Sequence, residues 1–317
     1  MAAPTLLDRR LVVVTGKGGV GKSTVASALA LLAVRAGKRV LVCEVNAQER
    51  VAPLLGAPPA GAREREALPG LFTVNVTPPE AMREYGLMVL RFRAIYAAVF
   101  ENRVMRYFLK AIPSLAELVM IGKILHEVRK AGSDGRPRWD LVVVDAPSTG
   151  HAIQLLRVPS ALLDTVPPGP LQHSARWMHD LLVDPERTAV ALVTLPEEMP
   201  VNETLELDAA LRSVVGNVPT TLFVNAMPAN RFAPGEESRL ATLAGERAPV
   251  GPAATAARLQ SIRARLAAEQ VARVRAALDL PTGLLPLLPL ADWGRAALER
   301  IAAAIDAAPP SREPWPR

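Results

Sequence analysis

The sequence contains a single cysteine, few aromatic residues and only six lysines among its 317 residues. One thiol, Cys43, excludes an internal disulfide and any metal site built from several cysteines. Charged residues interrupt every apolar run well short of the length that spans a bilayer, so we expect no integral membrane segment. The N-terminal residues lack the hydrophobic segment and cleavage site of a signal peptide, which predicts a cytoplasmic protein.

The sequence also lacks a concentrated basic segment, although its net charge is +6 and its pI is near 9.9. The arginines are spread along the chain, without a basic run or a nucleic-acid-binding signature. We therefore expect no nucleic-acid partner.

Several short apolar runs, rich in β-branched residues, alternate with helical stretches. Most of these runs are continuous rather than alternating, which is typical of strands that are covered on both faces. The order predicts an α/β fold with a doubly wound, mostly parallel sheet, formed by a single domain over residues 1–317. The predicted strands are Leu11–Val14, Val40–Val45, Leu141–Val144, Ala189–Val193, Thr221–Val224 and Leu284–Leu288.

A phosphate-binding loop directly follows the first predicted strand. Its glycines allow backbone N–H groups to surround a polyphosphate, and the N-terminus of the next helix adds its dipole. Lys22 is expected to reach the β- and γ-phosphates and Ser23 to hold Mg²⁺, which predicts ATP and magnesium as ligands. The alternative is a glycine-rich turn without a ligand. The loop comprises Gly16, Lys17, Gly18, Gly19, Val20, Gly21, Lys22, Ser23 and Thr24.

Asp145 stands at the end of the third predicted strand, where P-loop enzymes place the acid that holds magnesium. The residues after it include Gly150, whose backbone N–H could approach a γ-phosphate in a segment that rearranges when the phosphate leaves. The alternative is an ordinary aspartate between a strand and a loop.

Lys17 lies too early in the loop to reach the phosphates that its own loop surrounds. A long cation at this position can instead reach across a two-fold interface to the γ-phosphate of a partner, as an arginine finger does. The alternative is a surface lysine that the loop tolerates.

Helical segments are predicted between and after these strands. Residues 79–130 and 160–185 are interpreted as a helical subdomain inserted in the ATPase domain, and residues 258–278 as an amphipathic helix with Leu259, Ile262, Leu266, Val274 and Leu278 on one side. Residues 229–257 are predicted to include a mobile loop, and residues 308–317 to form a loose tail.

Taken together, the motifs resemble the ArsA and tail-anchored-protein-targeting ATPases, which belong to the MinD/ParA/ArsA class with a deviant Walker A loop. The loop at 16–24 resembles that Walker A sequence, and Asp145–Arg157 is similar to the switch II segment of the ArsA branch. Thr194–Glu198 resembles a Thr-Ile-Pro-Glu-Glu segment, and Phe223–Asn225 and Leu284–Asp292 resemble the adenine-side segments. The resemblance implies that the nucleotide site includes Glu197, Asn225, Pro286, Leu287, Leu288 and Pro289.

The sequence departs from this family at switch I, where members usually have Asp-Pro-Ala with an aspartate that positions the attacking water. Here Asn46 replaces that aspartate, and its amide can orient water but cannot accept a proton. Glu44 or Glu49 could substitute for the carboxylate. Activity is therefore expected to be weak, or the chain binds ATP without hydrolysing it.

The resemblance implies a partner as well as a nucleotide. Family members act as dimers, so we expect a homodimer or a heterodimer with a related subunit, and the Met- and aromatic-rich residues 82–120 could receive a hydrophobic client helix. These residues could equally form the core of the helical region. With Cys43 alone, the zinc clamp and the arsenite site of some members cannot be built.

Two other functions remain open from the sequence. The chain could be a non-hydrolysing scaffold subunit of a heteromeric complex, or a ParA/MinD-like positioning ATPase that acts on DNA or a membrane. The absence of a basic patch and of a terminal amphipathic helix argues against the second.

Overall fold

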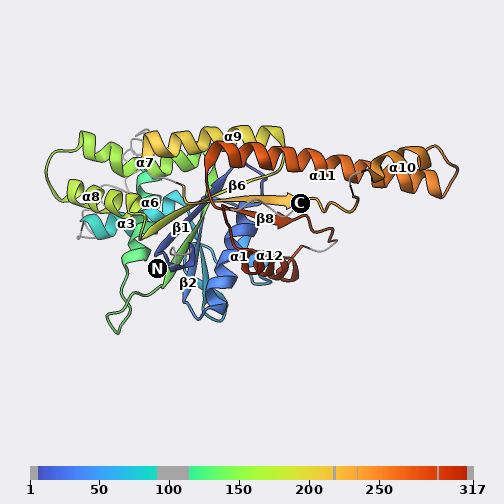
Figure 1. The fold of residues 1–317 in the computed structure, drawn as a ribbon. Helices are drawn as coiled ribbons and strands as arrows, with labels where there is room; N and C mark the ends of the chain where they lie inside the picture. The colour runs from blue at the N-terminus through green and yellow to red at the C-terminus, as the bar shows by residue number, and fades with distance from the viewer. Residues whose placement is uncertain (1–5, 91–113, 217–218, 234, 291–292, 313–317) are drawn as a thin grey trace.

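The computed structural model describes residues 6–90, 114–216, 219–233, 235–290 and 293–312. The described chain forms an eight-stranded sheet in the order β3-β4-β2-β5-β1-β6-β7-β8, in which only β3 and β4 pair antiparallel (Figure 1). The predicted α/β fold with a mostly parallel sheet is confirmed. The strands are β1 (Leu11–Gly16), β2 (Val40–Val45), β3 (Arg65–Leu68), β4 (Leu71–Val76), β5 (Leu141–Ser148), β6 (Thr188–Thr194), β7 (Thr221–Met227) and β8 (Thr282–Pro286).

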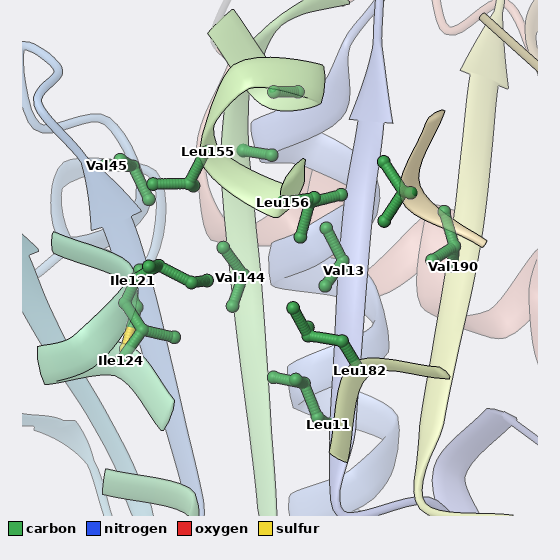
Figure 2. Packing of buried hydrophobic residues seen from close by; sticks show 14 of the residues in the cluster. Leu11, Val13, Val45, Ile121, Ile124, Val144, Leu155, Leu156, Leu182 and Val190 are labelled. Carbon is green, nitrogen blue, oxygen red and sulfur yellow. The ribbon is translucent and has the colours of Figure 1, made fainter. Parts of the chain in front are cut away.

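Helices cover both faces of this sheet. Successive residues of a strand point to opposite faces, so Val13 packs in one core and Val12 in the other. Figure 2 shows the first core, in which residues such as Ile121, Leu155 and Leu182 lie against the strands. The helices of this core are α3 (Pro78–Leu90), α6 (Leu115–Arg129), α7 (Thr149–Thr165), α8 (Pro170–Val183), α9 (Glu198–Ala210) and α11 (Val250–Leu278), and those of the other are α1 (Lys22–Arg35), α2 (Val51–Leu54) and α12 (Arg295–Ala307).

Two strands, β3 and β4, are absent from the sequence prediction. They form a hairpin around Gly70, whose φ of 80° is left-handed, and β4 pairs in parallel with β2. The charged residues of β3 are exposed and give no apolar run, which is common for a strand at the edge of a sheet. The last strand, β8, begins and ends two residues earlier than predicted, because the repeated Leu and Pro of this region mark no boundary.

The two predicted helical regions are mostly helical where the structure describes them, but α7 begins before residue 160 and the helix is interrupted at residues 166–169. Residues 91–113, which carry most of the predicted client region, lie outside the described residues. At the two ends of this region, Met120 is buried in the first core and Met82 packs against that core. The binding of a client by residues 82–120 stays a prediction. That these regions form a separate subdomain remains a prediction. Within the described residues, no helix is both long enough and apolar enough to cross a membrane.

Residues 229–257, which are predicted to include a mobile loop, contain helical segments as well as irregular ones, and the mobility stays a prediction. Helix α10 (Glu236–Leu243) packs against α11, which starts at Val250 rather than near residue 258. Figure 1 shows α10 and the first part of α11 extending beyond the sheet. The predicted apolar side of α11 is also partly wrong, because Leu259 and Leu266 are exposed and small residues such as Ala264 and Ala267 are buried instead.

The C-terminal tail begins later than predicted. Ser311 pairs with Thr282 of β8 through two backbone hydrogen bonds of 2.8 and 3.3 Å, so the chain is attached to the sheet up to this point. Residues 313–317 lie outside the described residues.

Candidate nucleotide site

The phosphate-binding loop runs from the end of β1 to the start of α1 and is fixed from β7. The Asn225 side-chain amide donates a hydrogen bond of 2.9 Å to the carbonyl oxygen of Val20. Gly21 has a φ of 93°, and a Cβ there would lie 2.2 Å from the Asn225 amide nitrogen. Only glycine therefore allows β7 to approach the loop this closely.

Lys22, the first residue of α1, bridges the two ends of the loop. Its ammonium donates a hydrogen bond of 2.9 Å to the carbonyl oxygen of Lys17, at the opposite end of the loop. Burial lowers its pKa, whereas Asp145 acts in the opposite direction. The loop thus holds a partly desolvated cation among its backbone groups, an arrangement suited to a polyphosphate.

Ser23 and Asp145 meet across the site, as the sequence predicts for a magnesium centre. The Ser23 hydroxyl donates a hydrogen bond of 2.6 Å to Asp145 Oδ2, and the Asp145 side chain is buried. Asp145 Oδ1 is also buried and has no hydrogen-bond partner among the described residues. Burial raises the pKa of Asp145. A hydroxyl and a carboxylate with one unused oxygen are hard donors that fit Mg²⁺ and its bound water.

Glu44 on β2 is a second buried carboxylate at this end of the sheet. The parallel pairing of β2 with β5 places Glu44 opposite Asp145. Glu44 Oε1 accepts hydrogen bonds from the backbone N–H groups of Arg50 and Val51, at 2.6 and 3.1 Å. Burial raises the pKa of Glu44 to about 7, against the effect of these two hydrogen bonds.

Of the two carboxylates that could replace the missing switch I aspartate, Glu44 is the one that pairs with Asp145 in the sheet. Glu49 accepts hydrogen bonds from the backbone N–H groups of Ala60 and Gly61, at 2.5 and 2.9 Å, and is occupied there. Asn46 follows β2 with a left-handed φ of 46°, and its side chain is exposed. Its backbone N–H is fixed by the carbonyl of Val76 at 2.9 Å.

After Asp145, β5 continues to Ser148, four residues beyond the predicted end of this strand, and leads directly into α7. Helix α7 begins at Thr149, so Gly150 and the exposed His151 lie in its first turn. Ser148, at the N-cap, makes no side-chain capping bond, which leaves the first N–H groups of the helix without that partner. Such a helix N-terminus favours anions.

The residues expected around the nucleoside follow β6, β7 and β8. Glu197 is exposed at the N-cap of α9, and Leu287 is half exposed after β8, with its N–H bound to the carbonyl of Met227 at 2.8 Å. Leu288 packs against the core formed with α1. A groove of about 1430 Å³ has Met227, Pro286 and Leu287 in its lining together with residues of α11, and none of its lining residues belongs to the phosphate-binding loop. Pro289, one residue beyond Leu288, is exposed.

Comparison with known proteins places this site in a family. Residues 9–166, about half of the chain, match the model of the anion-transporting ATPases. The chain belongs to the anion-transporting ATPase family. It is 34% identical to the ATPase BagA of Mycobacterium tuberculosis over 204 residues, which are 62% of this chain and 59% of the relative. The arsenical pump-driving ATPase of Escherichia coli is 30% identical over 206 residues, 64% of this chain and 32% of that protein.

The chain thus spans less than two thirds of the length of these family members. A putative arsenical pump-driving ATPase of Halobacterium salinarum is 26% identical over 235 residues, which are 69% of this chain and 35% of that protein.

Two electrostatic interactions near the loop of this anion-transporting ATPase family member cannot be recognised from the sequence around the residues involved. The Lys17 ammonium forms an ion pair of 2.5 Å with Glu203 on α9, 186 residues away, and both side chains are about one third exposed. Arg50, at the N-cap of α2, acts electrostatically on Lys22 and Asp145. Only the folded arrangement brings these charges to the loop.

The raised pKa of Glu44 predicts a pH-dependent stability. The carboxyl has a pKa of about 7 in the folded chain and an ordinary value of 4.5, so folding favours its protonated form. This contribution is complete below the ordinary pKa and is lost as the pH rises through about 7. The free energy of unfolding contributed by Glu44 should therefore fall by about 2 kcal/mol between about pH 5 and about pH 7.5.

Urea unfolding of the wild type and Glu44→Gln across this pH range isolates that contribution. The glutamine does not titrate, so the stability difference between the two proteins should change with pH in this direction. Parallel curves for the two proteins would contradict the assignment.

Proposed function

We propose that the chain binds ATP with Mg²⁺ at this loop and hydrolyses it slowly, as one half of a two-subunit ATPase. The observation that carries the proposal is the 2.6 Å contact between Ser23 and Asp145, beside a loop that holds Lys22. This is the arrangement in which P-loop enzymes hold magnesium and the β- and γ-phosphates. Membership of the anion-transporting ATPase family supports it.

Each residue has a role in this proposal. Lys22 exchanges the carbonyl of Lys17 for phosphate oxygens, and the loop N–H groups bind the remaining phosphate charge. Ser23 and Asp145 hold the Mg²⁺, which would neutralise charge on the β- and γ-phosphates during transfer to water. Asn225, already fixed to the loop, lies on the nucleoside side together with Glu197 and the 286–289 segment.

The partner is a second copy or a related subunit. The Lys17 ammonium is held by Glu203 on α9, while the Lys17 carbonyl oxygen accepts the hydrogen bond of Lys22. We infer that closing of two subunits exchanges this ion pair for the partner's γ-phosphate. The partly exposed position of the pair, at about one third, makes the exchange possible without unfolding.

The rate of ATP hydrolysis tests the role of Asn46. Its amide oxygen can orient the attacking water but takes no proton from it, so Asn46→Asp is expected to raise single-turnover cleavage of ATP by about 10-fold or more. Gln48→Glu is the matched control, because it adds the same charge two residues away at an exposed position.

Rapid-quench measurement of phosphate release from saturating MgATP distinguishes the outcomes. Slow cleavage by the wild type that rises only in Asn46→Asp supports the proposal. A wild type that binds MgATP but cleaves none, beside an active Asn46→Asp, would identify a non-hydrolysing subunit. Equal rates in all three proteins would show that Asn46 does not face the attacking water.

A further inference from the structure

Glu44 uses only half of its carboxylate. Oε1 accepts the backbone N–H groups of Arg50 and Val51, which fixes the start of α2. Oε2 is buried and has no hydrogen-bond partner among the described residues, and the whole residue is 1% exposed. A buried acceptor without a partner destabilises the folded chain, and more so when it is charged. Capping of α2 thus accounts for the burial of Oε1 but not for that of Oε2.

The unused oxygen belongs to a side chain on the same face of the sheet as the Ser23–Asp145 pair. Val42 on β2 and Val143 on β5 both pack in the core formed with α1. Glu44 and Asp145 are each two residues further along their strands, and a period of two places them on this same face. They are direct partners in the parallel register of β2 and β5.

Two unsatisfied carboxylate oxygens therefore belong to residues that are paired on neighbouring strands, and one of these residues, Asp145, contacts the first turn of α1. Asp145 Oδ1 is buried without a partner among the described residues, as is Glu44 Oε2. Asp145 Oδ2 already accepts the Ser23 hydroxyl at 2.6 Å. Mg²⁺ characteristically retains several bound waters, whose polarised O–H groups are strong donors to carboxylates.

We propose that Glu44 is a second carboxylate of the magnesium site, accepting a hydrogen bond from the water shell of Mg²⁺ through Oε2 as Asp145 does through Oδ1. The inference rests on the proposed function, because it assigns a residue to the same site. Glu44 offers a buried carboxyl oxygen from inside the sheet, beside a switch I that has the amide of Asn46 in place of a carboxylate. Its role is to position bound water rather than to take part in bond breaking.

Glu44→Gln separates this role from the capping of α2. The glutamine side-chain oxygen still accepts the N–H groups of Arg50 and Val51, while the charge and the second acceptor are removed. Glu49→Gln is the matched control, because Glu49 is bound to the backbone of Ala60 and Gly61 instead.

The experiment titrates Mg²⁺ into the full chain with a fluorescent ADP analogue and measures the Mg²⁺ concentration for half-maximal tight binding. Loss of a residue that orients metal ligands typically costs 10–100-fold in metal affinity. We therefore expect this midpoint to rise about 10-fold in Glu44→Gln, with affinity for the analogue in EDTA not weakened. The midpoint of Glu49→Gln should equal that of the wild type.

An unchanged midpoint in a folded Glu44→Gln, beside a raised midpoint in Asp145→Asn, would overturn the inference and leave the proposed function intact. A wild type that does not bind the analogue at any Mg²⁺ concentration would overturn the proposed function itself. If Glu44→Gln does not fold, Glu44→Asp keeps the charge but withdraws both oxygens by one methylene. A wild-type midpoint in that variant would equally overturn the inference.

Discussion

Lys22→Ala is expected to weaken binding of MgATP by two orders of magnitude or more, corresponding to about 3 kcal/mol. Lys22 is the cation that spans the phosphate-binding loop, and it is partly desolvated there, so its loss leaves the phosphate charge without its main counter-ion. Its side chain donates a hydrogen bond to the carbonyl of Lys17, and its charge also acts on the buried Asp145. Calorimetric titration with a non-hydrolysable ATP analogue measures the change.

Lys38→Ala is the matched control for this prediction. Lys38 follows the other end of α1 and binds the carbonyl of Leu7, far along the helix from the loop. Its replacement removes the same charge without changing the site, so affinity should remain that of the wild type. Equal losses in both variants would mean that the basic charge of the chain, rather than the loop, holds the nucleotide.

Lys17→Ala is expected to reduce turnover by about 1,000-fold while affinity for the nucleotide in the isolated subunit changes little, because a cation supplied in trans acts mainly on the transition state. Glu203→Gln is its counterpart. It releases Lys17 from the 2.5 Å ion pair but keeps the lysine, so turnover should be retained or increased. A Lys17→Ala variant with wild-type turnover would reduce Lys17 to a structural partner of Glu203.

Mixing the two inactive variants tests whether Lys17 acts across an interface. In a mixed dimer, a Lys17→Ala subunit keeps its own loop and receives Lys17 from the Lys22→Ala subunit. An equal mixture of freely exchanging subunits should then recover about a quarter of wild-type turnover, since half of the dimers have one complete site. No recovery in a mixture that forms mixed dimers would contradict action in trans.

The phosphate-binding loop and Asp145 could be recognised from short stretches of the sequence. The loop at 16–24 and Asp145 are each marked by an apolar strand followed by polar residues, because parallel strands bring their carboxyl ends to one edge of the sheet. The structure brings Ser23 and Asp145 into contact, and the family comparison agrees with the resemblance. The continuous apolar strands also gave the fold class, because they must be covered on both faces.

The contacts that refine the site depend on tertiary structure and could not be read locally. Lys17 meets Glu203, and Asn225 meets Val20, across separations of 186 and 205 residues. The structure also distinguishes Glu44, which pairs with Asp145 in the sheet, from Glu49, which binds the backbone of Ala60 and Gly61. The spacing of these residues in the sequence does not show this difference. The predicted apolar side of α11 holds for its last part, where Val274 and Leu278 are buried. Nearer its start small residues make the contact, so Leu259 and Leu266 remain exposed.

The most direct test of the account is steady-state release of phosphate from MgATP by the purified full chain, measured with Mg²⁺ and again in EDTA. The account predicts slow, saturable turnover that requires Mg²⁺ and disappears in Lys22→Ala. Turnover that is the same in EDTA, or the same in Lys22→Ala as in the wild type, would contradict a magnesium-dependent site at this loop.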